Sequence, residues 1–326
     1  MKTVWISEFI GVDGIGINEV DAPMPGVNEA LISVRAAGLN RADLLQAAGR
    51  YPPPENYSPN MPGMEFAGEI VELGAEVSGF AVGDRVFGIT VGHAQSEFVV
   101  SHPSLLAAIP DNLSYTEAGG IPEVYITAHD AVFTQNCLKE GETLLIHAAA
   151  SGVGLAALDL AKAAGAKVIG TSRTADKIER LADLGLEHGI LATDSKFAEK
   201  VLDITNGKGA DVILDLVGAE YFKENIASLA QKGRLSMVGL TSGTKAEIDL
   251  GSILRKRATI RGTTLRARPS EEKAAANEKF IREVIPLLNS GKVRPHLDRA
   301  FKLEDASEAY GYLASNKSFG KVVIEF

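Results

Sequence analysis

The chain has 326 residues, of which 45% are apolar, a formal net charge of −9 and one cysteine. This length suits two domains of about 150 residues each. The net negative charge excludes general binding of polyanions, which requires a basic face, so we expect no nucleic acid partner. A single cysteine excludes an internal disulfide framework and every zinc site that needs several thiolates.

No uncharged apolar run reaches the ~18 residues of a membrane-spanning helix. Residues 1–20 carry acids and glycines where a signal peptide needs an apolar centre. The sequence therefore predicts a soluble, cytoplasmic protein without a membrane partner. Cys137 is expected to be a small, buried or half-buried apolar residue.

Residues 1–121 have the pattern of a small, irregular, mostly β domain. Short β-branched runs alternate with glycine and proline, as in EALISVRAAGLN, FAGEIVELG, GDRVFGIT and SEFVVSH. Residues 50–64, RYPPPENYSPNMPGM, are rich in proline, which fixes φ and removes backbone donors. This segment is expected to be an ordered loop, and such loops often carry function.

From about residue 122 apolar runs alternate with amphipathic helices. Strand candidates are ETLLIHAAA, AKVIGTS, DVILDLVG, GRLSMVGL and ATIRGTTL, and helix candidates are VGLAALDLAKAAG, ADKIERLADLG and YFKENIASLAQKG. Strands separated by helices of this length form right-handed βαβ units, so residues 122–265 are predicted to form a doubly wound parallel sheet. Residues 266–326 contain the helix EEKAAANEKFIREVIPLLNSG and the closing strand GKVVIEF. We expect them to return to the first domain.

The stretch HAAASGVGLAALDLAKAAGAKVIGTSR, residues 147–173, has the order of a dinucleotide-binding unit: strand, turn, helix, strand. The glycine positions of G-x-G-x-x-G are occupied here by Ala149, Ser151 and Gly154. The N–H groups and positive dipole of a helix start suit a pyrophosphate. The residues predicted to hold it are Ala150, Ser151, Gly152, Val153 and Gly154.

The end of the second strand of this unit indicates the cofactor. Sites specific for NAD place an acid there, and its charge would repel a 2′-phosphate. This chain has Ser172 at that position, with Arg173 beside it and Lys177 one helical turn later. A hydroxyl and two cations suit a phosphate dianion, which favours NADP(H). The alternative is that both cations are solvated residues at a helix start.

Several polar residues have a simpler structural interpretation. Residues 255–268, RKRATIRGTTLRAR, carry six basic side chains and no acid, which could suit phosphate or nucleic acid. We favour solvated strand ends with one or two contacts to a cofactor. His147 and His129 are expected to be structural, whereas His93 is a candidate for contact with substrate.

Five segments stand in the order AAGLNRADLLQAAGRYPPP, PGMEFAGEIVELG, GDRVFG, AAASGVGLAALDLAKAAGA and GKVVIEF. With them the chain resembles the medium-chain dehydrogenase/reductase superfamily, and within it the quinone oxidoreductases, the branch that includes zeta-crystallin and the p53-inducible quinone oxidoreductase. The resemblance implies a GroES-like, mostly β substrate domain formed from both chain ends, residues 1–121 and 266–326. It implies a Rossmann NADP-binding domain at residues 122–265, and a homodimer.

The chain departs from the zinc alcohol dehydrogenases of this superfamily. They have a cysteine ligand where this chain has Asn40 and a histidine where it has Met64, so Glu65 lacks those partners. Their four-cysteine structural lobe is absent as well. The resemblance therefore implies a zinc-independent enzyme. A quinone or enone acceptor fits this, because the charge that hydride addition creates spreads onto a carbonyl oxygen that needs only hydrogen-bond donors.

The resemblance also implies roles for individual residues. Tyr51 and Asn40 are the catalytic candidates, with Tyr51 as donor to the developing enolate or quinone oxygen and Asn40 orienting it. Thr127 matches a threonine near the nicotinamide carboxamide, and Leu265 and Lys321 lie in segments that reach the cofactor. Three further cofactor contacts are expected where parallel strands end, because doubly wound sheets bind ligands there: Val217, Gly239 and Leu240.

These features together predict an NADPH-dependent reductase that transfers hydride to a small-molecule quinone or α,β-unsaturated carbonyl. Three alternatives stay open at this point. They are an enoyl-thioester reductase of the same architecture, a zinc alcohol dehydrogenase, and a non-enzymatic NADPH-binding or RNA-binding protein of the zeta-crystallin type. Tyr51 could also serve only to pack the proline-rich loop.

Overall fold

The computed structural model describes all 326 residues and divides them into two units. Unit 1 comprises Met1–Ile126 and Leu265–Phe326, and unit 2 comprises Thr127–Thr264. The sequence pattern placed the first boundary earlier, at residues 121/122, where a helix begins. That helix, α3 (Pro122–His129), runs across the division, and its first turn belongs to unit 1.

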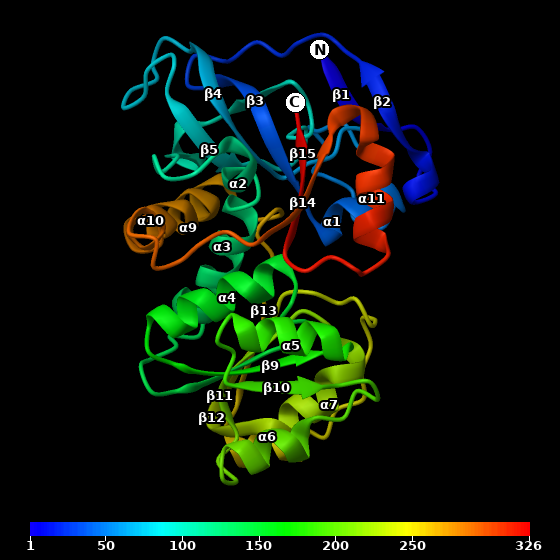
Figure 1. Cartoon of the computed structure of the whole chain (residues 1–326), viewed down its shortest axis with the longest axis vertical. Coiled ribbons are helices and arrows are strands. Elements are labelled where there is room, and N and C mark those ends of the chain that lie inside the picture. The colour runs from blue at the N-terminus through cyan, green and yellow to red at the C-terminus, as the bar shows by residue number, and fades with distance from the viewer. The chain divides into compact units, whose positions relative to one another are not determined.

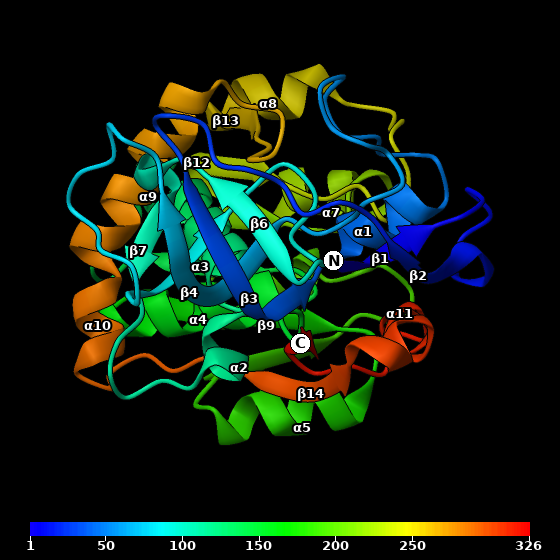
Figure 2. The ribbon, with the colours of Figure 1, turned by 90° about the horizontal axis from the view of Figure 1, so that it is seen from above.

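A sheet of seven strands forms the centre of unit 1. Its order is β14-β15-β3-β4-β5-β7, and β6 pairs with β3 on the edge opposite β4 (Figure 2). All neighbouring strands are antiparallel except β14 and β15. The strands are β3 (Ala30–Leu39), β4 (Glu65–Leu73), β5 (Arg85–Ile89), β6 (Phe98–Ser101), β7 (Leu106–Ala108), β14 (Leu297–Lys302) and β15 (Lys321–Glu325). The last strand of the chain therefore pairs with β3, as the predicted discontinuous domain requires (Figure 1).

Helices and a hairpin complete unit 1. They are β1 (Lys2–Ile6), β2 (Ile15–Glu19), α1 (Arg41–Ala47), α2 (Tyr115–Ala118), α9 (Ser270–Glu283), α10 (Ile285–Asn289) and α11 (Ala306–Ala314), with short 3₁₀ turns at Val12–Gly14, Pro103–Leu105 and Leu303–Asp305. The single helix predicted in the C-terminal segment is two helices, α9 and α10. Pro286 lies in the first turn of α10, where a missing N–H is tolerated, and the helix is interrupted just before it at Val284.

Unit 2 is a parallel sheet of six strands in the order β10-β9-β8-β11-β12-β13. The strands are β8 (Thr143–Ile146), β9 (Lys167–Ser172), β10 (His188–Leu191), β11 (Ala210–Asp215), β12 (Leu229–Met237) and β13 (Thr259–Gly262). In chain order within the unit this is 3-2-1-4-5-6, the order of the Rossmann fold. The predicted fold class is confirmed. The strand order reverses between β8 and β11, where such sheets bind their ligands.

The helices of unit 2 connect these strands. They are α4 (Gly152–Ala163), α5 (Ala175–Asp183), α6 (Ala198–Ile204), α7 (Ala219–Ser228) and α8 (Leu250–Lys256), and a π-helical turn at Asp130–Thr134 continues α3. The prediction that YFKENIASLAQKG is helical throughout was wrong after Ser228, because β12 already begins at Leu229. No helix in the structure is both long and apolar enough to cross a membrane.

Candidate functional site

The turn between β8 and α4 has the geometry of a phosphate-binding turn. Ser151 is the N-cap of α4, and its hydroxyl accepts a hydrogen bond from the N–H of Gly154 at 3.1 Å. Gly152 and Val153 are the first two residues of α4, so their N–H groups have no acceptor within the helix. These donors and the positive end of the helix dipole fit a pyrophosphate.

Gly154 is the glycine of this turn that the packing requires. A Cβ atom on it would lie 2.6 Å from the carbonyl oxygens of Ala148 and Ala149. Side chains essentially never approach backbone so closely, so only glycine lets α4 start directly against the end of β8. Ala148 adopts a left-handed φ of 48°, which turns the chain sharply at the end of β8. Gly154 thus has the packing role of the last glycine in G-x-G-x-x-G.

The residues predicted to hold the 2′-phosphate lie at the end of β9 and the start of α5. Arg173 is exposed, and its guanidinium has no hydrogen bond or ion pair in the structure. Ser172 is buried, and its hydroxyl accepts the N–H of Thr174 at 3.4 Å, which leaves its proton available. The carboxylate of Asp176 bonds to Thr174 at the start of α5, and this hydrogen bond is the main reason that its pKa is lowered. Lys177 follows on α5 and is half-buried.

A buried chain of hydrogen bonds lies at the ends of β8 and β11, between which the strand order reverses. His147 is fully buried, with Nδ1 3.0 Å from the hydroxyl of Thr171 and Nε2 2.6 Å from the amide oxygen of Asn225. The amide nitrogen of Asn225 donates to Asp215, whose other oxygen accepts the N–H of Val217 at 2.8 Å. Because that amide oxygen faces the imidazole, Nε2 carries the proton. His147 is structural, as predicted.

Burial explains the titration behaviour of this chain of groups. Burial lowers the pKa of His147 to about 4, so that the ring is neutral at pH 7. Burial raises the pKa of Asp215 to about 6, while its hydrogen bonds from Val217 and Gly218 oppose the shift. The network therefore holds the turn after β11 through a largely ionised carboxylate and a neutral imidazole. The sequence pattern did not reveal Asn225, which has no motif of its own.

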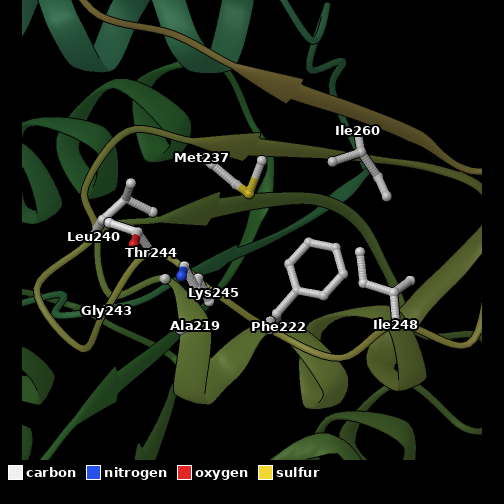
Figure 3. Close-up of a pocket in the computed structure, with 11 residues that line it drawn as sticks. Ala219, Phe222, Met237, Leu240, Gly243, Thr244, Lys245, Ile248 and Ile260 are labelled. Carbon is white, nitrogen blue, oxygen red and sulfur yellow. The ribbon is translucent and has the colours of Figure 1, made fainter.

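The other predicted cofactor contacts of unit 2 follow the ends of its strands. Val217 comes just after β11, and Gly239 and Leu240 come just after β12. A hollow of about 410 Å³ begins beside Leu240 and is lined mainly by apolar side chains (Figure 3). Its walls include Phe222 from α7, Met237 from β12, Ile248, Ile260 from β13 and Lys245. It adjoins this edge of the sheet, because Gly218 also lines it.

In unit 1 the structure brings Asn40, Glu65 and Lys321 together. The ammonium of Lys321 donates to Glu65 at 2.6 Å, to the amide oxygen of Asn40 at 2.9 Å and to the carbonyl oxygen of Leu39 at 2.7 Å. The amide of Asn40 donates in turn to Glu65 at 2.8 Å. All three protons of the ammonium are thus used inside unit 1, and a hydrogen bond from Lys321 to cofactor would have to replace one of them.

Arg266 connects Tyr51 to the same region. Its buried guanidinium donates to the carbonyl oxygens of Val91 and Tyr51, at 2.6 and 3.2 Å, and to the side chain of Gln46 at 2.7 Å. It also lies over the ring of Tyr51, 5.3 Å from the centroid. The proline-rich loop is therefore fixed by a residue that is far away in sequence. Burial raises the pKa of Tyr51, so its hydroxyl stays protonated at neutral pH.

The basic segment at residues 255–268 does not form one basic surface. Arg255 pairs with Asp249, and Lys256 donates to carbonyl oxygens at the end of α7 and the start of β12. Arg261 donates to Gln135, and Arg266 is buried. These partners lie in different places, so the segment offers no continuous phosphate-binding face. The interpretation as strand ends fits better.

Local geometry bears on two other expectations, and contact of His93 with substrate stays a prediction. The ring of His93 accepts the N–H of Ser58 at 3.0 Å and lies against Tyr57, so it supports the proline-rich loop from inside unit 1. Cys137 was predicted to be at least half-buried and this was wrong, because it lies exposed in a turn with a left-handed φ of 46°.

The residues at the zinc position of the superfamily do not form a zinc-binding set. Asn40 and Met64 are not thiolate or imidazole ligands, and Glu65 is engaged by Lys321 and Asn40. No group of three histidine, cysteine or acidic side chains in the chain could hold a metal ion. These residues do not fit a catalytic zinc ion, and zinc independence stays a prediction.

Comparisons with known proteins agree with this geometry. The model of the alcohol dehydrogenase GroES-like domain matches residues 26–137, and that of the zinc-binding dehydrogenase family matches residues 152–281. Quinone oxidoreductase-like protein 2 of Mus musculus is 33% identical over 312 residues, covering 94% of this chain and 88% of that protein. The chain belongs to the medium-chain dehydrogenase/reductase superfamily.

Solved structures of this superfamily have the same architecture. A quinone oxidoreductase of Pseudomonas syringae pv. tomato superimposes with a TM-score of 0.90 at 29% identity, over 100% of this chain and 99% of that one. The CurK enoyl reductase gives 0.89 at 29% identity, over 99% and 98% of the two chains. A mycobacterial protein, Rv1454c, solved with NADPH, gives 0.89 at 28% identity over both whole chains. This chain is therefore an oxidoreductase of the superfamily with a nucleotide-binding domain.

The remaining predicted site residues are placed as follows. Thr127 lies on α3 at the start of unit 2 and is half-buried. Leu265 is buried at the point where the chain re-enters unit 1. Sequence reasoning missed Arg266, Asp43 and Glu123. The signal that could have found them is a charged residue within an otherwise apolar segment, but this does not identify its partners.

Proposed function

We propose that the protein reduces quinones or α,β-unsaturated carbonyls with NADPH and without a metal. The observation that supports this most is the state of Tyr51. Its ring is held by Arg266, its hydroxyl forms no hydrogen bond within unit 1, and it stays protonated at neutral pH. Such a hydroxyl can donate to the oxygen on which charge develops when a conjugated acceptor takes up a hydride.

NADP(H) supplies the hydride in this proposal. The start of α4 would hold its pyrophosphate, and Arg173 with Ser172 would hold the 2′-phosphate. The unpaired guanidinium of Arg173 favours the phosphorylated cofactor, because it can form a bidentate pair. Asp194 and Glu220 act on Tyr221 together with Arg173, so the local charge is mixed. The preference for NADPH therefore depends mainly on Arg173.

The test of the cofactor is the substitution Arg173→Ala. Loss of a hydrogen bond to a charged group costs about 1.5–3 kcal/mol, so NADPH should bind roughly 10- to 150-fold more weakly, while NADH affinity changes little. Lys177→Ala is the matched control and should have the smaller effect. Equal affinity of the parent for NADH and NADPH would contradict the assignment.

The test of the reaction is oxidation of NADPH and NADH, measured side by side with 9,10-phenanthrenequinone, 1,4-benzoquinone, a medium-chain alkyl enone and crotonyl-CoA. Turnover of a quinone or enone with NADPH supports the proposal. Tight NADPH binding without turnover of any acceptor would instead support the non-enzymatic alternative.

An enoyl-thioester reductase is the second candidate, and the similarity to the CurK enoyl reductase favours it. Reduction of an enone and reduction of an enoyl thioester both need a donor at a carbonyl oxygen and a proton at carbon, so the chemistry at Tyr51 is shared. Competition between crotonyl-CoA and the free enone separates the two, because an enoyl-thioester reductase should prefer the thioester.

We also propose a homodimer that forms through β13. This strand is the edge of the parallel sheet, is largely exposed and pairs on one side only, with β12. Exposed Leu250 and Leu254 lie on α8, directly before it. Pairing of two edges covers otherwise free backbone groups. Sedimentation of the parent and of Ile260→Pro tests this, since proline at the edge should give monomers.

A further inference from the structure

Glu123 is a carboxylic acid that has no hydrogen bond to its side chain within unit 1. It is the second residue of α3 and is half-buried. Its backbone N–H donates to Glu65 at 2.9 Å, which fixes its position next to the buried Lys321–Glu65 pair. The backbone is therefore held firmly while the carboxyl group itself stays available.

Titratable groups from several elements interact with this carboxyl. They are Glu65 on β4, Asp43 on α1, Lys321 on β15, Arg266 and Tyr51 in loops, and Lys273 on α9 as a weaker neighbour. Lys321 is already paired with Glu65, and Arg266 interacts with the buried carboxylate of Asp43. Glu65 thus has an ion pair with Lys321, whereas Glu123 has no ion pair, and the cations Lys321, Arg266 and Lys273 act on it only through charge interactions over longer distances.

A buried carboxylate without an ion pair is unfavourable, and this cost is avoided if Glu123 keeps its proton. Burial, and then the nearby carboxylate of Glu65, raise the pKa of Glu123 to about 8. The group is therefore mostly neutral at pH 7, with a proton that it can give up. Its charge in turn acts on Tyr51, so both residues serve the same region of unit 1. Thr127, the predicted nicotinamide contact, lies one helical turn after Glu123 on the same face of α3.

We propose that Glu123 is the general acid that protonates the α-carbon of an enone. The inference rests on the proposed function. Hydride forms the new C–H bond at the β-carbon, and the π electrons move to the carbonyl oxygen, where Tyr51 donates. The O–H bond of Glu123 then breaks, its proton forms a C–H bond at the α-carbon, and the carboxylate regains a proton from water. Enone, NADPH and one proton thus give saturated ketone and NADP⁺.

Reduction of a quinone differs from reduction of an enone in the atoms that are protonated. The reduced quinone takes protons on oxygen, which exchanges them rapidly with water, whereas carbon is protonated slowly and benefits from a positioned acid. The role of Glu123 therefore predicts a separation between two classes of substrate. A residue needed only for folding would affect both classes alike.

The experiment compares the parent, Glu123→Gln, Glu123→Asp and the control Glu278→Gln, which changes an exposed glutamate on α9. Each is assayed with 9,10-phenanthrenequinone and with an enone that carries a methyl group on its α-carbon. Glu123→Gln should lower kcat for the enone by about 100-fold or more, the range of general acid catalysis, and change kcat for the quinone little. Glu123→Asp should restore part of the enone activity, and Glu278→Gln should match the parent.

The stereochemistry of the product gives a second readout. A proton delivered by Glu123 reaches one face, so the parent should give an excess of one enantiomer, and Glu123→Gln should give a mixture closer to racemic. Unchanged enantiomeric excess, or equal loss of quinone and enone turnover, would overturn the role. For the parent, kcat with the enone should fall as pH rises through about 8.

Infrared titration separates this inference from the proposed function. The parent and Glu278→Gln should show the band of a protonated carboxyl at pH 7 that Glu123→Gln lacks and that disappears near pH 8. Absence of this band would overturn the inference even if the parent reduces enones. If the parent reduces neither acceptor, the proposed function fails, and Glu123 loses this role whatever its band shows.

Discussion

The ammonium of Lys321 lies 2.6 Å from a carboxylate oxygen of Glu65, and both side chains are almost fully buried. Lys321 begins β15 and Glu65 begins β4, and both strands pair with β3. The ion pair therefore joins the last strand of the chain to the N-terminal part of unit 1. It also places the amide of Asn40, which bonds to both members.

Breaking this pair should destabilise unit 1 strongly. Lys321→Met leaves Glu65 as a buried, unpaired charge, which costs about 3–5 kcal/mol. The double substitution Lys321→Met with Glu65→Leu removes both charges and should recover much of this loss. Urea unfolding of both variants measures the difference. A double variant as unstable as Lys321→Met alone would show that the pair itself, and not the unpaired charge, carries the stability.

The two catalytic candidates should behave differently when they are truncated. Tyr51→Phe removes only a hydroxyl without a partner in unit 1, so turnover should fall while stability and NADPH affinity stay close to those of the parent. Asn40→Ala leaves Glu65 and Lys321 each without one hydrogen bond, which should cost about 1–3 kcal/mol of stability besides any loss of turnover. Steady-state kinetics and thermal unfolding test this. Unchanged turnover of Tyr51→Phe would refute its assignment as a donor.

Gly154→Ala should damage the phosphate-binding turn. The new methyl group would lie 2.6 Å from two carbonyl oxygens, so α4 must move away from β8. Such overpacking costs about 1–3 kcal/mol, and NADPH affinity should fall at least ~10-fold because the N–H groups at the helix start are displaced. Isothermal calorimetry measures the affinity. The control is Gly16→Ala on β2, where no atom lies within 4 Å of the added carbon.

The buried network of His147, Asn225 and Asp215 should make the free energy of unfolding depend on pH. The pKa of His147 is lowered from 6.5 to about 4, so its neutral form stabilises the fold above pH 6.5, and this contribution is lost as pH falls towards 4. The loss amounts to about 3 kcal/mol. The pKa of Asp215 is raised from 3.8 to about 6, so its contribution has the opposite sign and is lost as pH rises through 6.

These two contributions can be separated by substitution. The stability advantage of the parent over His147→Gln should shrink by about 3 kcal/mol between pH 7 and pH 4, because groups common to both proteins cancel. Denaturant unfolding at a series of pH values measures it. An advantage that does not change with pH would mean that the imidazole is not buried in its neutral form.

The alternation of strands and helices determined the parallel sheet from the sequence alone. The sequence also predicted the turn at Ala149–Gly154, the arginine after β9 and the return of the last strand to the first domain. Each depends on residues close together along the chain, on a periodic pattern or on a family resemblance that spans the chain. Local geometry then decides their conformation, as the clash that a side chain at Gly154 would cause shows.

The polar cluster of unit 1 could not be predicted in this way. Lys321 and Glu65 are 256 positions apart, and Arg266 and Gln46 are 220 positions apart. The sequence around a charged residue on a strand or loop does not identify the residue with which it will pair. The exposed position of Cys137 and the early end of α7 likewise depend on neighbours outside the local sequence. Only the tertiary structure decided that Glu65 has an ion pair with Lys321 while Glu123 is buried next to them without an ion pair, because the side chains around each carboxyl group come from distant parts of the chain.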